Sequence, residues 1–176
     1  HLGDATSIRN TRLNSLFDIA YAYAKQGSYS ALDAVLFAGD IADSGSVIQL
    51  SAFRTIVDAK LKSGTQLLVT MGNHEFYNGL SPEQTIQNFM QMFGENAHVV
   101  INGFHFIYFA PDVGKGEGFS AQTLSWVENE LAIAVEDNPN LPIFVMQHQH
   151  PQDTVYGSDD WGRSELNAIF NKYPQV

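Results

Sequence analysis

The most constraining feature of this chain is a short apolar run near its centre that ends abruptly in polar residues. Four of the five residues from Leu67 to Met71 are apolar, which is typical of a strand buried on both faces of a parallel sheet. The sequence Gly-Asn-His-Glu follows directly at 72–75. Glycine allows a sharp turn and close approach to a ligand, and the next three side chains can bind metal or transfer protons. Because open α/β sheets carry their chemistry at the carboxyl ends of strands, we predict a functional site here.

Two other apolar runs end in residues of the same kind. They precede Gly39-Asp40 and His148-Gln149-His150. Parallel strands joined by crossover helices bring their carboxyl ends to one edge of a sheet, so these distant residues are expected to converge. Carboxylate, amide and imidazole groups together suit divalent or trivalent first-row metals. The pattern therefore predicts an assembled metal site.

The rest of the chain alternates helical periodicity with short apolar runs. This alternation predicts an α/β fold around a mainly parallel sheet, with one hairpin at Asn102-Gly103. The segment 111–119 contains three glycines and is expected to be a mobile loop. The expected helices cover about 7–25, 46–61, 81–93, 120–135 and 161–172, and the expected strands cover 33–38, 67–71, 97–101, 104–110 and 142–147.

Composition narrows the classes of partner and cofactor. The chain has 176 residues, 44% of them hydrophobic, which fits one domain over 1–176. Its net charge of −10 argues against nucleic acid as a partner. No apolar run approaches the roughly 20 residues that span a bilayer, so no membrane span is expected. The chain has no cysteine, so any metal must be held by Asp, Glu, His and Asn.

Three motifs together resemble one known family. Gly-Asp-Ile-Ala-Asp at 39–43, Gly-Asn-His-Glu at 72–75 and the strand-end His148 are similar to the motifs of calcineurin-like metallophosphoesterases, which include the purple acid phosphatases. His-Leu-Gly-Asp at 1–4 resembles the remainder of that family's opening Asp-x-His motif, without its aspartate. The resemblance covers nearly the whole chain, in the family's order, and implies an α/β/β/α sandwich.

The resemblance also implies roles for individual residues. Asp40 would bridge two metal ions, Asn73 and His148 would bind the second ion, and His1 would lie beside the first. His74 would not be a ligand; it would lie near the scissile phosphate, where it stabilises charge or protonates the leaving oxygen. Glu75 would orient His74 or the metal-bound solvent.

The sequence departs from the family pattern at both ends. The family closes with a Gly-His-x-His motif that supplies a ligand to each metal, and no such motif follows His150. We interpret 1–176 as the core portion of a metallophosphoesterase domain, truncated at both ends. The missing ligands also motivate an alternative function, a scaffold domain with an incomplete metal site that acts in protein interaction.

The function predicted from these motifs is metal-dependent hydrolysis of a small-molecule phosphate ester, as a phosphodiesterase or a phosphomonoesterase. The resemblance implies a binuclear centre of Mn, Fe or Zn and a metal-bound hydroxide as nucleophile. A nuclease of the same family is disfavoured by the acidic composition. His148 is favoured over His150 as the ligand because it is nearer the apolar run, whereas His98 and His105 are expected to be structural. The scarcity of lysine and the absence of cysteine favour an extracytoplasmic location.

Overall fold

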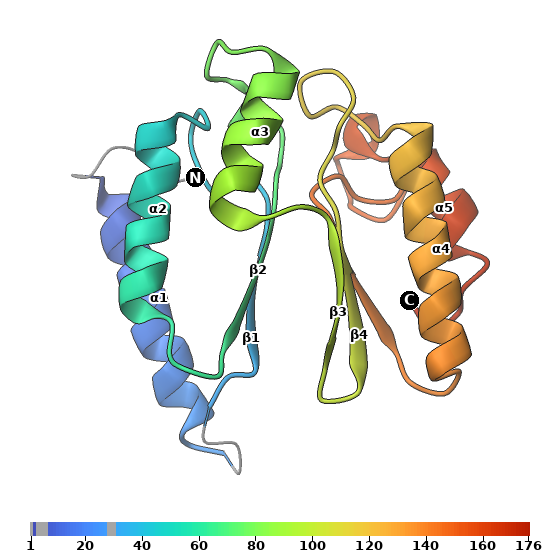
Figure 1. Cartoon of the computed structure of the whole chain (residues 1–176), viewed down its shortest axis with the longest axis horizontal. Helices are drawn as coiled ribbons and strands as arrows, with labels where there is room; N and C mark the ends of the chain where they lie inside the picture. The colour runs from blue at the N-terminus through green and yellow to red at the C-terminus, as the bar shows by residue number, and fades with distance from the viewer. Residues whose placement is uncertain (1, 3–6, 28–30) are drawn as a thin grey trace.

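The protein is described here by a computed structural model, which describes residues 2, 7–27 and 31–176. Helices, strands and two 3-10 turns follow one another along the chain (Figure 1). They are α1 (Ile8–Ala24), β1 (Ala34–Ala38), α2 (Val47–Lys60), β2 (Gln66–Thr70), η1 (His74–Phe76), α3 (Pro82–Phe93), β3 (Ala97–Ile101), β4 (Phe104–Tyr108), α4 (Ala121–Asp137), β5 (Ile143–Met146), η2 (Asp159–Trp161) and α5 (Ser164–Phe170).

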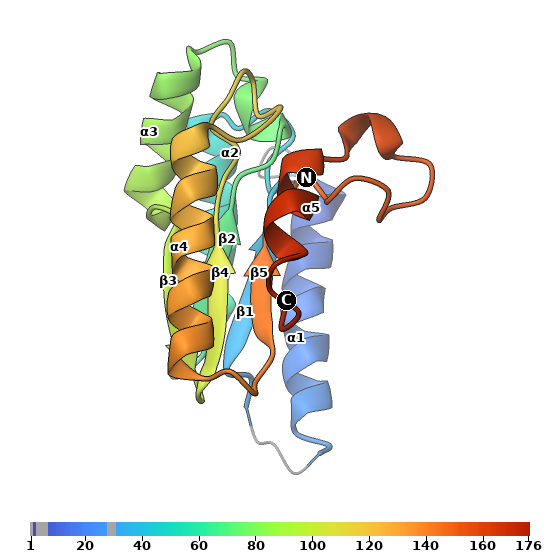
Figure 2. The ribbon, with the colours of Figure 1, turned by 90° about the vertical axis from the view of Figure 1, so that its right-hand side faces the viewer.

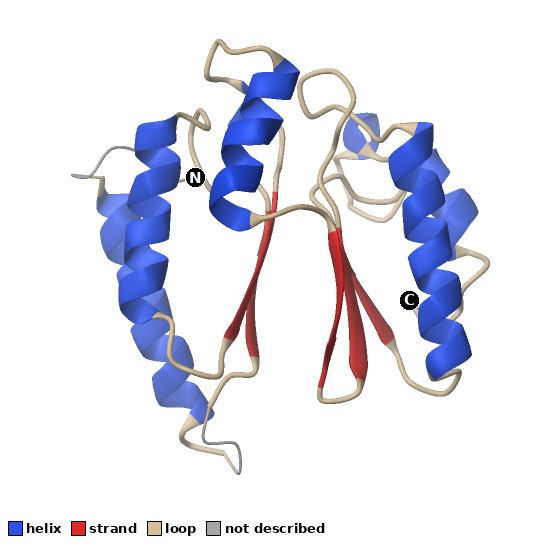
Figure 3. Cartoon of the chain, in the orientation of Figure 1, coloured by secondary structure: helices blue, strands red, loops and turns tan. Residues whose placement is uncertain are grey.

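The first half of the chain forms a two-stranded parallel sheet covered by helices. Strands β1 and β2 pair with Val35 opposite Leu67, and α1 and α2 lie on the outer face (Figures 1 and 3). Phe37 from β1 meets Phe53 from α2 edge-on, with ring centroids 4.9 Å apart. Such aromatic contacts, together with the buried Val57, fix the helices against the sheet. This packing holds the carboxyl ends of β1 and β2 side by side.

The second half forms a three-stranded sheet of mixed direction. Strands β3 and β4 pair in antiparallel fashion, and β4 pairs with β5 in parallel. Asn102 and Gly103 have φ angles of 52° and 84°, the left-handed conformation that a two-residue hairpin turn requires at both positions. The predicted hairpin is therefore confirmed. Helices α4 and α5 cover the outer face (Figure 2), and their buried residues include Leu131 and Leu166.

The two sheets face each other, which gives four layers in the order α/β/β/α (Figures 1 and 3). A small apolar cluster of Leu68, Ile101 and Met146 lies between them. The buried Thr70 Oγ1 donates a hydrogen bond of 2.7 Å to the carbonyl of Phe109, which links the end of β2 to the segment after β4. The carboxyl ends of strands from both sheets therefore meet at one end of the molecule.

The predicted α/β class and all ten expected elements are confirmed, with two corrections. The strands form two sheets instead of one mainly parallel sheet. The last helix begins at Ser164 instead of 161, because Arg163 is engaged in extended pairing: its N–H donates to His150 O at 2.9 Å, and its carbonyl accepts from Gln152 N at 3.3 Å. None of the helices in the described residues is long and apolar enough to cross a lipid bilayer.

Candidate metal centre and active site

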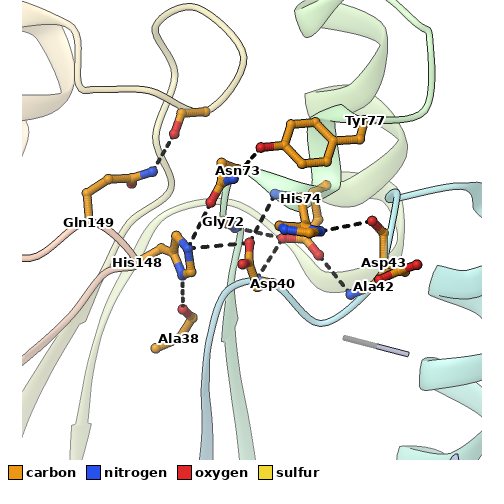
Figure 4. A network of polar contacts seen from close by, with 12 residues as sticks. Ala38, Asp40, Ala42, Asp43, Gly72, Asn73, His74, Tyr77, His148 and Gln149 are labelled. Carbon is orange, nitrogen blue, oxygen red and sulfur yellow. Dashed lines mark hydrogen bonds and ion pairs between the residues drawn. The ribbon is translucent and has the colours of Figure 1, made fainter. Parts of the chain in front are cut away.

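Three chain segments meet at the end of the molecule where the strands terminate. Asp40 lies in the loop after β1, Asn73 and His74 in the loop after β2, and His148 directly after β5. Figure 4 shows the side chains of Asp40, Asn73 and His148 turned toward one another, with the His74 ring beside them and joined to Asp43. The convergence predicted from the strand ends is therefore present in the fold for these four residues.

Two glycines allow the loops after β1 and β2 to pack backbone against backbone. Gly39 has a φ of 81°, and a Cβ there would lie 2.6 Å from the backbone nitrogen of Gly72. A Cβ on Gly72 would overlap Oδ1 of Asp40. Asp40 itself has a φ of 53°, a left-handed conformation that is uncommon for a residue other than glycine and is often found at functional sites. The close approach of the two loops therefore requires both glycines.

Glu75 joins the two loops through hydrogen bonds to their backbones. It is fully buried; its Oε2 accepts the N–H groups of Asp40 at 2.9 Å and Gly72 at 2.7 Å, and its Oε1 accepts that of Ala42 at 2.9 Å. Burial raises the pKa of Glu75 above its usual range, and the hydrogen bonds from Ala42 and Gly72 oppose that shift. Glu75 was expected to orient His74 or the metal-bound solvent; its contacts in the structure organise the backbone of both loops.

Three side-chain atoms next to these loops can donate an electron pair to a metal ion. They are Asp40 Oδ1, Asn73 Oδ1 and His148 Nε2, and together they are called the donor group. His148 Nδ1 lies 2.9 Å from the carbonyl of Ala38, so this nitrogen carries a hydrogen, and in the neutral ring Nε2 presents a lone pair. That Nε2 is 3.1 Å from Oδ1 of Asn73 and 3.4 Å from Oδ1 of Asp40. The amide of Asn73 is oriented by its Nδ2, which donates to the Tyr77 hydroxyl at 2.6 Å. Three acceptor atoms thus face one another.

This donor group fits a divalent metal ion. With a neutral His148 ring, three electron-pair donors face one another, and a cation among them would relieve their repulsion. The mixture of carboxylate, amide oxygen and imidazole suits first-row metals. A metal-binding histidine commonly donates its other ring N–H to a backbone carbonyl, as His148 does to Ala38. Asp40, Asn73 and His148 would therefore hold the ion.

The donor group is a partial metal site among the described residues. Within 2, 7–27 and 31–176, no three Asp, Glu, His or Cys side chains lie together in a way that could hold a metal. His1, predicted to lie beside the first metal, is outside the described residues. Its neighbour Leu2 donates its N–H to Ile41 O at 2.7 Å and forms a parallel bridge with Ala42. Leu2 therefore lies beside the Asp40 loop.

His74 lies beside the donor group and contacts it through its backbone. Its backbone N–H donates to Oδ1 of Asp40 at 3.0 Å, and its ring Nδ1 is 3.0 Å from the carbonyl of Asp43. The ring also packs against that of Tyr77, with centroids 4.7 Å apart. These contacts fix the imidazole next to Asp40, where it can donate or accept a proton.

Comparison with known proteins agrees with this geometry. A family model described as calcineurin-like phosphoesterase matches residues 1–176. The chain belongs to this family. It is thus a metal-dependent phosphoric ester hydrolase, as the motifs predicted.

One solved structure supports the fold independently. It is a dimetal phosphatase from Danio rerio, with a TM-score of 0.64 and 16% sequence identity, and the match covers 93% of this chain and 69% of the other. At this identity the likeness establishes the fold alone. Among curated proteins, none matches the sequence.

Three further histidines in the described part of the chain are not among the donor-group atoms. His150 follows the same strand as His148; its carbonyl accepts from Arg163, and its ring Nε2 is buried without a hydrogen-bond partner among the described residues. His98 and His105 lie on the hairpin, where they contact each other and two carboxylates. The structure therefore brings together Asp40, Asn73 and His148.

Two contacts of the site were not anticipated from the sequence. One is that of Tyr77, whose hydroxyl orients the Asn73 amide. Its place four positions after Asn73 is a spacing that brings side chains together on a helical turn, so the sequence did contain a signal. Gln149 reaches across to the carbonyl of Gly116, and no local pattern indicates that pairing.

Proposed function

We propose that this phosphoesterase hydrolyses a small-molecule phosphate ester at the ends of β1, β2 and β5 with two divalent metal ions. Asp40 would bridge the ions, Asn73 and His148 would hold the second, and His1 would contribute to the first. The observation that carries the proposal is the convergence of Asp40 Oδ1, Asn73 Oδ1 and His148 Nε2. Mn, Fe or Zn suits these ligands.

Positive charge beside this group favours an anionic substrate. A cavity of about 300 Å³ lies next to Asp40, and Arg9 and Arg12 contribute to its wall. These two side chains stand out in a chain with nine basic and nineteen acidic residues. Arg9 Nη1 is paired with Asp43 Oδ1 at 2.9 Å, so the guanidinium of Arg12 would be the group in this wall that attracts phosphate oxygens toward the site.

Each residue of the site has a distinct part in the proposed reaction. Bound divalent ions would neutralise phosphoryl oxygens and lower the pKa of coordinated water toward about 7. His74 would protonate the leaving oxygen, with its ring held by the carbonyl of Asp43 and its backbone tied to Asp40. Tyr77 would keep the oxygen of the Asn73 amide turned toward the ion.

Metal analysis combined with one substitution tests this function. The purified chain should bind two first-row metal ions, hydrolyse chromogenic phosphate esters, lose activity on chelation and regain it with Mn²⁺. His74→Asn should retain both metals while hydrolysis falls about 10²- to 10⁴-fold, the usual contribution of a general acid. The loss should be smaller for an ester whose leaving group is already a weak base.

A matched pair of variants tests the ligand assignment. His148→Asn should weaken metal binding strongly, whereas His150→Asn should leave it near the wild-type value. The reverse result would move the ligand to His150. Comparison of a monoester with a diester in the same assay would define the substrate class.

The alternative function, a scaffold with an incomplete metal site, is favoured by one observation. The described part of the chain contains only Asp40 and His148 as acidic or histidine members of the donor group. A chain that binds no metal and shows no hydrolysis even with Mn²⁺ present would support the scaffold and refute the enzyme.

A further inference from the structure

The loop between β4 and α4 lies close to the donor group and is held by more contacts than its glycine content suggests. It was expected to be mobile because of glycines at 114, 116 and 118. In the structure, hydrogen bonds fix both ends of this loop. Val113 N and Asp112 N donate to Gly118 O at 3.2 and 3.0 Å, and Glu117 N donates to Val113 O at 3.0 Å. These bonds close the loop at its base into a compact tip over 114–117.

The exit of the loop is fixed to the start of α4. The Asp112 carboxylate accepts the N–H and hydroxyl of Ser120, both at 2.6 Å, and the hydroxyl of Thr123 at 2.7 Å. Ser120 is also the N-cap of α4, so loop and helix share one hydrogen-bonded junction. Because hydrogen bonds fix the base of the loop and its junction with α4, the position of the tip depends on the contacts that residues 114–117 make.

Gly116 is the residue of the tip that touches the site. It has a φ of 78°, and a Cβ there would lie 2.8 Å from both Asn73 Cα and the ring of Phe76. The tip therefore rests directly on the backbone of a proposed metal ligand. Only glycine can combine this left-handed conformation with so close an approach.

The same glycine is bound from the other side by Gln149. The side-chain Nε2 of Gln149 donates a hydrogen bond to Gly116 O, and Figure 4 shows the amide extending toward the loop. Gln149 is only 2% exposed, so this bond is shielded from water and difficult to replace. Gln149 directly follows His148, the second proposed ligand on this side of the site.

We propose that Gln149 and Gly116 form a positioning clamp that sets the placement of Asn73 relative to His148 and thereby the affinity for metal. Gly116 bears on Asn73 by direct packing, and Gln149 ties the same loop residue to the segment that carries His148. The clamp thus links the ends of β2 and β5, which belong to different sheets. This inference rests on the proposed function for its consequence, but the clamp itself has a separate test.

Limited proteolysis measures the clamp without reference to activity. Lys115 lies in the tip, so trypsin cleavage after Lys115, followed by mass spectrometry, reports how often the tip opens. Gln149→Met keeps the side-chain length but removes the donor. It should speed this cleavage about fivefold to tenfold, as expected for the loss of one buried hydrogen bond. Gln147→Met is the matched control, because Gln147 lies on the same segment without a hydrogen bond from its side chain to the loop.

A glycine pair tests the packing against Asn73. Gly116→Ala should force the tip or Asn73 to shift, since its Cβ would meet backbone. Gly118→Ala is the control, because a Cβ there meets nothing within 4 Å. Both Gln149→Met and Gly116→Ala should weaken metal affinity about 10- to 100-fold, the usual effect of losing a group that orients a ligand. Calorimetric titration with Mn²⁺ would measure this, with urea unfolding of each variant used to confirm that the titrated protein is folded, and neither control should change the affinity.

The outcomes separate the clamp from the enzyme. Unchanged cleavage at Lys115 in both variants would overturn the clamp, and faster cleavage with unchanged metal affinity would overturn its positioning role. If the wild-type chain binds no Mn²⁺, the proposed function and the positioning role both fail, while the cleavage ratio still decides whether the clamp exists.

Discussion

Two groups of histidine and carboxylate residues lie in different parts of this molecule and have opposite electrostatic character. On the hairpin, His98 Nδ1 meets Glu130 at 2.8 Å, His98 Nε2 meets His105 Nδ1 at 2.7 Å, and His105 Nε2 meets Asp137 at 3.0 Å. Each ring nitrogen of this closed histidine network has a partner. Each of the three contacts is satisfied by one hydrogen lying between the two facing atoms.

The donor group at the strand ends is arranged the other way. His148 Nε2 faces two oxygen acceptors, those of Asn73 and Asp40, and its own hydrogen is committed to Ala38. In the closed histidine network, the facing atoms are joined by hydrogen bonds. In the donor group, a bound cation would join them. The number of histidines therefore does not identify a metal site; the direction of their lone pairs does.

The largest expected effect comes from removing the charge at the centre of the donor group. Asp40→Asn keeps the side-chain volume but loses the carboxylate proposed to bridge both ions. We expect hydrolysis to fall about 10³-fold or more, since metal neutralisation of the phosphoryl oxygens supplies several kcal/mol. Metal content and initial rates would be measured together, with Asp58→Asn on α2 as the control. A variant with full metal content and full activity would contradict the comparison.

An intermediate effect is expected from the residue that aims the amide oxygen. Tyr77→Phe removes the hydroxyl that accepts the Asn73 N–H at 2.6 Å, so the amide is free to rotate its oxygen away from His148. Metal affinity should fall about 10- to 100-fold, while activity at saturating metal should largely recover. Competition with a fluorescent chelator would measure the affinity. Tyr156→Phe, at a fully exposed side chain, should change neither quantity.

The smallest effect on catalysis is expected from the closed histidine network. His105 is 3% exposed, and His105→Leu would leave His98 Nε2 and the Asp137 carboxylate without this partner. The free energy of unfolding should fall by about 1–3 kcal/mol, measured by urea denaturation. Metal affinity of the folded protein should stay at the wild-type value. A loss of metal here would show that the hairpin histidines belong to a metal site after all.

Much of the site could be predicted because each of its residues follows a recognisable local sequence pattern. Asp40, Asn73 and His148 each follow a short apolar run, and the ends of such strands converge in α/β folds. The hairpin at Asn102-Gly103 was equally predictable, since two adjacent residues determine that turn. The contacts of Glu75 were not, because its oxygens reach backbone N–H groups more than thirty positions away.

The sequence by itself determined the order of helices and strands, the family and the residues capable of binding metal, because each depends on near neighbours or on a short motif. The tertiary structure alone decided which acceptors face each other and that the Tyr77 hydroxyl orients the Asn73 amide. It also decided that Gly116 packs against Asn73 and accepts a hydrogen bond from Gln149. Those features depend on the packing of two sheets and on individual rotamers. Hydrogen bonds and lone pairs are directional over a few ångströms, and no local pattern specifies distances that small between segments so far apart.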